Sequence, residues 1–363
     1  MKDLGRFIFA SIVVLAAASC RFVFATFLVL AIASCRKDTA IFIPLETTVT
    51  VESDTSWKAD LSALSNLSTT VLPPLSIEKL VSQLSPEPKL DTCNAERGGT
   101  ITVPDNVTLT IPASACVNSQ NRPCTGKLDV EILILRKKGD FIAFNLPTSS
   151  GNRQLISGGV VSVKIRQNGQ EVRLAGGKTI SVRYIMTEPD SQMQLFDGKF
   201  DGRFNFDWIP IPSSIPIAGR PSVTPWVDSS QQRRGYNMVL DRFGVINCDK
   251  FSGDSTNFSN KFNVVLPENF TNVNTSVYVA FKDLNSVLAL GGNAGAKAFV
   301  PFGRGLPVGR VVTVVVLGYV KDKFYLVTKE VTIQNANGAT PQTIRLTPEI
   351  KEKDALKEVL KNL

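Results

Sequence analysis

The sequence predicts an all-β protein in which two β-sandwich-like domains follow an apolar signal and a tether, with a short helix at the end. Between residues 98 and 346 many segments alternate apolar and polar residues with a period of two, as strands with one buried face do. Turn-forming residues separate these segments about every ten residues. The last residues instead carry apolar side chains at helical spacing.

Composition divides the chain into parts. Two apolar runs give way to Ser-, Thr-, Leu- and Pro-rich sequence, and strand patterning follows. The expected parts are a signal peptide (1–34), a lipid-anchored tether (35–90), a β-sandwich domain (91–190), an aromatic, Pro-rich connecting region (191–255), a second β-sandwich domain (256–347) and a helix (348–363).

Charge and composition narrow the function classes. The formal net charge is +8, and it is +6 for a chain that starts at Cys35, because residues 1–34 contain three basic residues and one acidic residue. Basic residues form no run of the kind that binds nucleic acid, so we expect no nucleic-acid partner. The chain contains no histidine, which excludes Ser-His-Asp and Cys-His nucleophilic sites and most catalytic zinc sites.

The N-terminus contains two apolar runs, 7–19 and 22–34, and a cysteine follows each run. Each run has the length of a signal peptide and is shorter than a membrane span of roughly 20 residues. The sequence before Cys35 resembles a bacterial lipobox, with an aliphatic residue three places upstream, so Cys35 is the predicted lipidation site. Cys20 is the alternative, either as the processed cysteine or as part of one transmembrane helix over 7–34 interrupted by Arg21.

Lipid on Cys35 would make the membrane a partner, and we expect an outer-membrane lipoprotein that faces the periplasm or the cell surface. The charged residues 36–38 resemble a surface-export signal of Bacteroidota lipoproteins. In the tether, Ser76 and the apolar face up to Leu84 predict a short helix, with a disordered spacer as the alternative.

Strands are expected in the first domain, and Asn168-Gly169 predicts a two-residue hairpin turn because both residues tolerate positive φ. The expected strands are 100–103, 107–111, 128–134, 161–166, 171–174 and 180–184. The connecting region predicts a turn at 196–200, a long loop at 209–230 and a strand at 236–246.

The second domain predicts another set of short strands, with a hairpin turn at 321–323 and a flexible Gly-rich loop at 291–295. The expected strands are 262–266, 277–281, 311–316, 324–327, 331–333 and 344–346. Thr347-Pro348-Glu349 is typical of a helix start. The stripe Leu356, Val359, Leu360 and Leu363 predicts that this helix docks on the last domain.

Four cysteines remain after Cys20 and Cys35. In an oxidising compartment they favour two disulfides, and four cysteines allow three pairings. We favour Cys116–Cys124, which closes a short polar loop, and this leaves Cys93–Cys248. No CxxC pair exists, so we expect no metal, and the sequence indicates no cofactor.

Acidic and aromatic side chains give two further candidates. Asp197, Asp201 and Asp207 lie among aromatic residues, where paired carboxylates could hydrolyse a glycoside, although Asp-Gly turns explain two of them. Ring stacking on sugar is the other possibility, and core packing is its alternative. The candidate ligand-binding aromatics are Trp208, Trp226 and Tyr236.

Several stretches resemble known families. GGTITVP (98–104) and LTIPASA (109–115) resemble the opening of ZU5 modules, which implies a protein-interaction domain. TSSG (148–151), LISGG (155–159) and NCDKF (247–251) resemble uncharacterised Bacteroidota lipoproteins, although an aromatic residue commonly stands there at the position of Val245. This second resemblance covers roughly residues 95–350 and implies an exported β-sandwich protein with no catalytic residues to carry over.

The sequence therefore favours a non-enzymatic, membrane-anchored lipoprotein that binds an envelope protein or scaffolds an envelope complex. A surface glycan-binding lipoprotein is the second hypothesis, and a carboxylate-based hydrolase is the third.

Overall fold

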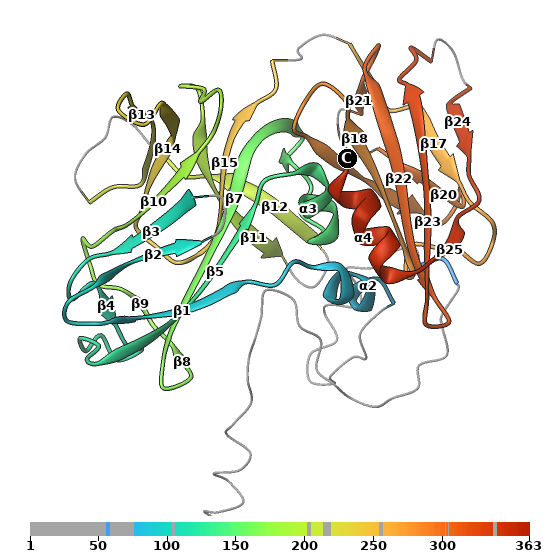
Figure 1. Cartoon of the computed structure of the whole chain (residues 1–363). Coiled ribbons are helices and arrows are strands. Elements are labelled where there is room, and N and C mark those ends of the chain that lie inside the picture. Colours follow the sequence, from blue (N-terminus) through green and yellow to red (C-terminus); the bar gives the residue numbers. More distant parts are fainter. Residues whose placement is uncertain are drawn as a thin grey trace, which may run out of the picture. The chain divides into compact units, whose positions relative to one another are not determined.

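The computed structural model describes residues 56–58, 76–103, 106–201, 205–212, 219–253, 257–301, 303, 305–336 and 340–363. The structure is mostly β, with 53% strand and 9% helix, several antiparallel sheets and a C-terminal helix, which confirms the predicted fold class at that level (Figure 1). The predicted signal peptide, Cys20, Cys35 and most of the predicted tether lie outside the described residues.

The first β region, residues 89–251, contains two large sheets (Figure 1). One has the order β1 (Lys89–Asn94), β5 (Lys127–Leu135), β7 (Arg153–Gln167), β15 (Gly244–Phe251), β11 (Gln194–Asp201), β12 (Asn205–Pro210), with β6 (Ser149–Ser150) and β8 (Gln170–Glu171) beside β7. The other has the order β13 (Ser222–Asp228), β14 (Arg233–Leu240), β10 (Ile180–Ile185), β3 (Val107–Ile111), β2 (Gly99–Val103). A small ladder joins β4 (Cys116–Val117) to β9 (Arg173–Leu174).

Alternation explains the core of this region. Strand β3 buries Val107, Leu109 and Ile111 while the threonines between them are more exposed, as the period of two predicts. Buried side chains from both large sheets form one continuous hydrophobic core.

The second β region, residues 258–351, forms an eight-stranded sheet around its own core. Its order is β24 (Gln342–Arg345), β17 (Phe262–Val265), β20 (Ala298–Val300), β19 (Val287–Asn293), β18 (Thr275–Phe281), β22 (Val311–Val320), β23 (Lys323–Thr332), β25 (Glu349–Lys351). Strands β16 (Phe258–Ser259) and β21 (Leu306–Pro307) pair separately.

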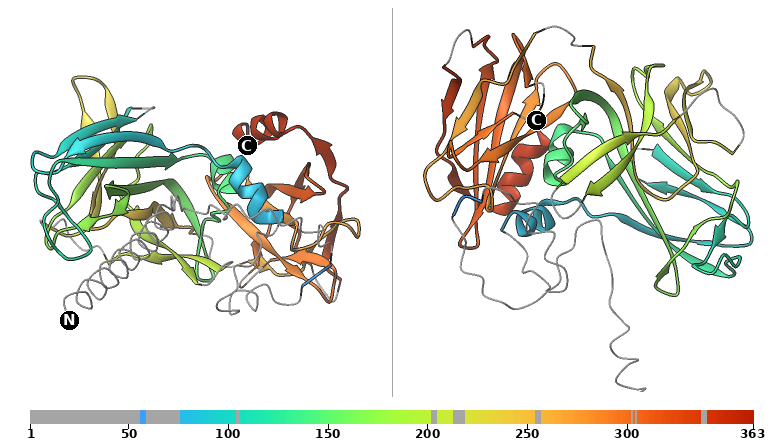
Figure 2. Two further views of the ribbon diagram at one scale, coloured as in Figure 1. Left: turned by 90° about the horizontal axis from the view of Figure 1, so that it is seen from below. Right: turned by 180° about the vertical axis from the view of Figure 1, so that it is seen from behind.

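Three helices lie where the two β regions meet (Figures 1 and 2). Helix α2 (Ser76–Leu84) has the predicted bounds and packs on β18 and β22. Helix α3 (Lys138–Ala143) contacts β19 and α4 (Lys353–Lys361). Helix α4 buries Leu356 and Leu360, as predicted, but it begins at Lys353, because Glu349–Lys351 pairs with β23 as strand β25.

Both predicted hairpin turns are confirmed. Asn168 and Gly169 have φ values of 51° and 80°, and they join Gln167 to Gln170. Lys321 and Asp322 have φ values of 50° and 55° between Val320 and Lys323. Positive φ at both central residues defines a type I′ turn.

Three predictions in the connecting region and one in the second domain are wrong. The expected turn at 196–200 is the middle of β11, the expected loop at 209–230 contains β13, and the expected strand at 236–246 is divided between β14 and β15. These strands pair within the sheets of the first β region. Gly291 and Gly292 belong to strand β19 rather than to a flexible loop.

Candidate functional site

The structure offers no test of the lipidation site, because Cys35 lies outside the described residues, so this site stays a prediction. Across the described ranges, no helix has both the length and the hydrophobicity needed to cross a bilayer.

The three candidate sugar-binding aromatics do not form a surface. Trp208 and Tyr236 are 0% exposed, and Trp208 Nε1 donates to the carbonyl oxygen of Pro147 at 2.9 Å. Trp226 is half-buried and lies under the guanidinium group of Arg183, 5.1 Å from its ring centroid. Burial therefore contradicts stacking on sugar by this trio, since two of the rings have no face open to solvent.

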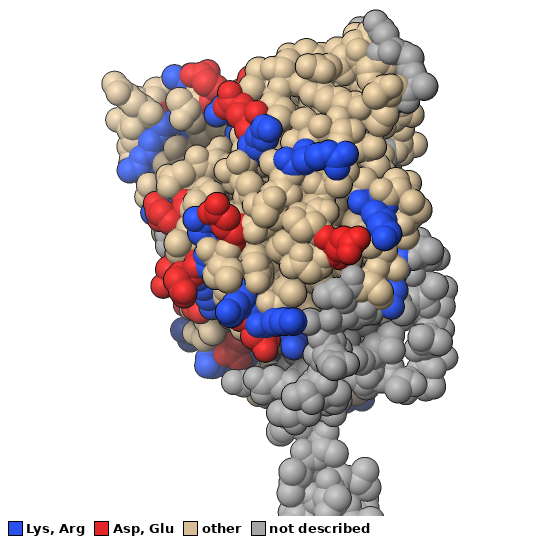
Figure 3. Space-filling model, turned by 90° about the vertical axis from the view of Figure 1, so that its right-hand side faces the viewer, with Lys and Arg blue, Asp and Glu red and all other residues tan. Residues whose placement is uncertain are grey.

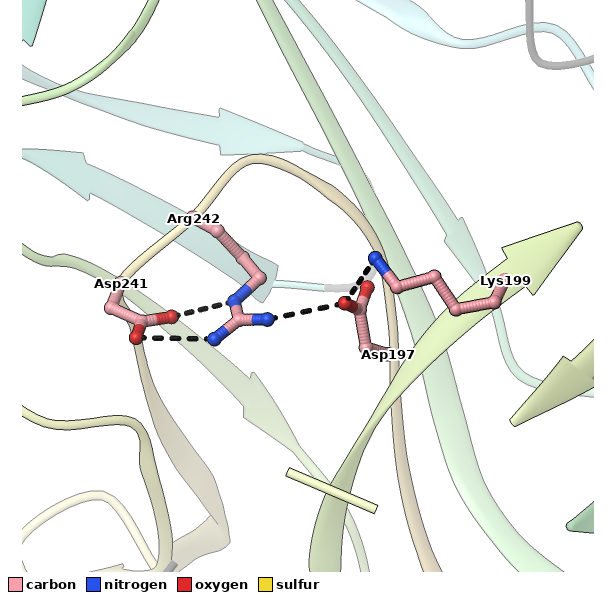
Figure 4. Close-up of polar contacts among 4 residues, drawn as sticks. All are labelled: Asp197, Lys199, Asp241 and Arg242. Carbon is pink, nitrogen blue, oxygen red and sulfur yellow. Dashed lines mark hydrogen bonds and ion pairs between the residues drawn. The ribbon is translucent and has the colours of Figure 1, made fainter. Parts of the chain in front are cut away.

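Two of the candidate carboxylates, Asp197 and Asp207, have ion-pair or hydrogen-bond partners within the protein. Asp197 Oδ2 lies 2.7 Å from Lys199 Nζ and 3.1 Å from Arg242 Nη1 (Figure 4). Arg242 also forms a two-point contact with Asp241, and these pairs raise the pKa of its guanidinium group. In this cluster Asp197 Oδ2 is held between two cations, one on β11 and one on the segment after β14.

The carboxyl of Asp207 bonds to the backbone of a neighbouring segment. Its Oδ1 accepts a hydrogen bond from the backbone N–H of Gly151 at 2.8 Å, which ties the β11–β12 hairpin to the β6 segment. The side chain of Asp201 lies outside the described part.

The described residues include four free cysteines, and the order of the strands contradicts one predicted disulfide. Cys93 lies on β1 and Cys248 on β15, with β5 and β7 between them. Three strand spacings of about 4.8 Å already separate the two strands by about 14 Å, twice the reach of a disulfide. The pairing registers add an offset of about nine residues along β7, roughly 30 Å, between the positions that face Cys93 and Cys248. No group of three or more Cys, Asp or Glu side chains in the described ranges is arranged to hold a metal ion.

The other predicted pair is well placed. The Cys124 N–H donates to the carbonyl oxygen of Cys116 at 3.0 Å, and the bridge between Val117 and Pro123 sets the two cysteines opposite each other. No disulfide joins them in the structure, so the Cys116–Cys124 bond stays a prediction for the oxidised protein. Burial raises the pKa of the Cys116 thiol to about 12, so that as a free thiol it would react slowly.

A buried polar junction holds the residues of the lipoprotein-like motifs. At its centre, Gly158 and Gly159 of β7 oppose the single residue Cys248 of β15, which makes a β-bulge. Gly159 has φ +132°, and a Cβ on Gly158 would lie 2.9 Å from the Cys248 carbonyl oxygen. The paired glycines therefore allow the two strands to approach closely.

Asp249 and Asn247 stabilise this bulge from within. Asp249 is 0% exposed, and its Oδ2 accepts a hydrogen bond from Asn247 Nδ2 at 2.6 Å. The hydroxyl of Ser157 donates to Asn247 Oδ1 at 3.1 Å. Burial raises the pKa of the Asp249 carboxyl well above its usual value. These buried hydrogen bonds fix the conformation of the bulge.

The same segment binds the second β region through Asn285. The Asn285 Nδ2 group donates to the carbonyl oxygens of Arg136 at 2.9 Å and Ser157 at 2.8 Å. The Ser157 N–H donates in turn to the Asn285 carbonyl oxygen at 2.8 Å. One side chain of the second region therefore satisfies two backbone carbonyls of the first.

Thr148 makes a second set of hydrogen bonds between the two β regions. Its N–H donates to the carbonyl oxygen of Val287 at 2.7 Å, and its hydroxyl lies 2.9 Å from the hydroxyl of Ser286, which Gln154 Nε2 also reaches at 2.8 Å. The residues of this junction that the sequence analysis missed are Asn285, Ser286 and Gln154. Asp283-Leu284-Asn285-Ser286 is typical of a polar turn, and no local signal distinguishes it from a solvent-exposed one.

The charged surface gives no separate site on the face that Figure 3 shows. Among the described residues there, Lys and Arg side chains are interspersed with Asp and Glu rather than gathered in one basic patch. This distribution is typical of a solvated surface.

Buried hydrogen bonds of this junction join the two β regions. The chain matches no protein-family model and no curated protein.

Proposed function

We propose that this protein is an outer-membrane lipoprotein anchored through Cys35, whose two β-sandwich-like regions form one non-catalytic body. That body binds an envelope protein or scaffolds an envelope complex. The observation that carries the proposal is the polar junction, because a scaffold needs its binding surfaces held at a fixed separation.

The chemistry of the junction supports rigidity. Hydrogen bonds between buried groups cost much to break, because each unmatched partner would lose about 1–3 kcal/mol. Thr148, Ser157 and Asn285 make such bonds across the two regions. The TSSG (148–151) and LISGG (155–159) segments contribute Thr148 and Ser157 to this junction, so the resemblance concerns architecture.

Edge strands supply the surfaces for a partner. Four exposed apolar side chains lie one on each of four edge strands: Leu90 of β1 (72% exposed), Ile209 of β12 (45%), Val227 of β13 (71%) and Ile350 of β25 (53%). An edge strand offers unpaired backbone groups to a partner strand, and an exposed apolar side chain beside them adds buried area.

Photo-crosslinking in native envelopes tests the proposal. A photoreactive amino acid replaces, one at a time, Leu90, Ile209, Val227 and Ile350. Asp129 is the matched control, because it is exposed on β5 and is paired on both sides, with Thr92 of β1 and Arg166 of β7. We expect a discrete adduct from at least one edge position and none from Asp129. Adducts that are the same at all five positions, or absent from all, contradict partner binding at an edge.

A further inference from the structure

A three-residue piece of the predicted tether binds to the second β region. The indole ring of Trp57 packs against Phe299, with ring centroids 5.2 Å apart, at the edge of the core of that region. Ser56–Lys58 is the only described part of the chain before Ser76, and it lies beside strands more than 200 residues later in the sequence.

The side chain of Asn272 forms two hydrogen bonds with the backbone of Lys58. Its Oδ1 accepts the N–H of Lys58 at 3.0 Å, and its Nδ2 donates to the carbonyl oxygen of Lys58 at 2.8 Å. The amide side chain therefore offers the donor and acceptor that a neighbouring strand would offer. Such a pair of bonds recognises extended backbone and holds it in one place.

Contacts within the second β region hold Asn272 in the position that binds Lys58. Asn272 is 8% exposed, and its loop is held by Asn274, whose side chain accepts the N–H of Thr271 at 2.9 Å and donates to the carbonyl oxygen of Asn269 at 3.0 Å. A Cβ on Gly292 would lie 2.3 Å from the Cβ of Asn272, so only glycine at 292 leaves room for this side chain.

We infer that Asn272, Gly292 and Phe299 form a clip whose occupant is the chain's own Ser56–Lys58, and that the clip sets how far the β body reaches from its anchor. The effect of the clip on reach rests on the proposed lipid at Cys35. From Cys35 to Ser56 an extended chain spans at most about 75 Å, whereas from Cys35 to Ser76 it spans at most about 150 Å. Closing the clip therefore halves the maximum reach.

Limited trypsin digestion of the full-length protein in detergent tests the clip. Trypsin cuts after Lys58 only when the Lys58 carbonyl oxygen enters the oxyanion hole of the protease, and that oxygen is bonded to Asn272. We expect Asn272→Ala, Gly292→Ala and Trp57→Ala each to speed cleavage of the Lys58–Ala59 bond by about tenfold or more, because the bond must first leave the clip. Mass spectrometry of fragments that begin at Ala59 gives the rate.

The controls separate the clip from general unfolding. Asn293→Ala changes a neighbouring asparagine that bonds only its own turn in the described contacts, and it should cleave like wild type. Trp57 lies in the tether and packs against the core from outside, so Trp57→Ala should leave the β body folded at the temperature of the digestion. Equal Lys58 cleavage rates in wild type and all three clip variants contradict the clip. Protection that is lost on dilution assigns the occupant to a second copy and contradicts the proposal for one chain.

Neutron reflectometry of the lipidated protein on a supported bilayer tests the reach. The protein layer should extend further from the bilayer in Asn272→Ala than in wild type or Asn293→Ala. An unchanged profile, with Lys58 cleavage accelerated, contradicts the role of the clip in setting reach. A protein that does not remain on the bilayer contradicts the lipid anchor and leaves the digestion result to decide on the clip.

Discussion

At the residue scale, Gly198 lies in a strand although its sequence context indicates a turn. Asp197-Gly198 is a turn dipeptide, yet it lies within β11, opposite Trp208. A Cβ on Gly198 would lie 3.1 Å from the rings of both Phe206 and Trp208. The glycine therefore makes room for aromatic rings that cover the strand, and it does not provide a positive φ.

Gly198→Ala should destabilise the protein by about 1–3 kcal/mol, because the two rings must shift to admit the methyl group. Urea unfolding measures this change. Gly176→Ala is the control, since a Cβ there meets no atom within 4 Å, and it should change stability by less than about 0.5 kcal/mol. Equal effects from both substitutions would contradict the packing described here.

The buried carboxyl of Asp249 predicts that the stability of the protein depends on pH. Its folded-state pKa lies well above the ordinary value of 3.8, chiefly because the carboxyl is buried. The folded protein then holds this proton more tightly than the unfolded chain does. Its contribution to stability is fully present below pH 3.8 and declines as the pH rises toward the folded-state pKa.

Asp249→Asn should remove this decline. The free energy of unfolding of the variant, relative to wild type, should rise with pH above 4 by up to about 1.4 kcal/mol per pH unit. Urea midpoints between pH 4 and pH 8 supply the measurement. A difference between the two proteins that is independent of pH contradicts a protonated, buried Asp249.

At the element scale, strands and tight turns could be predicted because their signals are local. Residues 107–111 alternate, and Asn168-Gly169 favours positive φ, so both are correct in the structure. Strand order leaves no such local signal. The Cys93–Cys248 prediction is wrong because only the sheet order reveals the two strands between β1 and β15.

The start of the C-terminal helix illustrates competition between elements. Thr347-Pro348-Glu349 has the composition of a helix start, but Glu349–Lys351 pairs with β23 and delays the helix to Lys353. Tertiary pairing outweighs a capping preference of about 1 kcal/mol. The buried stripe was predictable, because helical spacing is a local property.

Gly139 controls how α4 docks. A Cβ on Gly139 would lie 1.9 Å from the Leu360 carbonyl oxygen, so Gly139→Ala must push α3 and α4 apart. We expect amide hydrogen exchange in α4 to accelerate, and stability to fall by about 1–3 kcal/mol. Lys137→Ala, at an exposed neighbouring position, should leave exchange in α4 unchanged. Unchanged exchange in Gly139→Ala contradicts the observed contact.

At the scale of the whole molecule, the polar junction couples the two β regions. Asn285→Asp keeps the side-chain size but removes the donor that serves the carbonyl oxygens of Arg136 and Ser157. Two buried acceptors then face a carboxylate, at a cost of about 2–5 kcal/mol. We expect calorimetry to show one unfolding transition for wild type and two for Asn285→Asp.

Asn293→Asp is the control for this substitution, because Asn293 only accepts the N–H of Ala296 among its described contacts, and a carboxylate does the same. It should unfold in one transition, like wild type. Two transitions in wild type itself contradict the claim that the junction joins the regions into one body.

The central claim is that a lipid on Cys35 holds this β body at a membrane. Metabolic labelling with an alkyne analogue of palmitate tests it most directly, in wild type, Cys20→Ala and Cys35→Ala. We expect label on wild type and Cys20→Ala and none on Cys35→Ala. Label that persists in Cys35→Ala, or that disappears in Cys20→Ala alone, would contradict it.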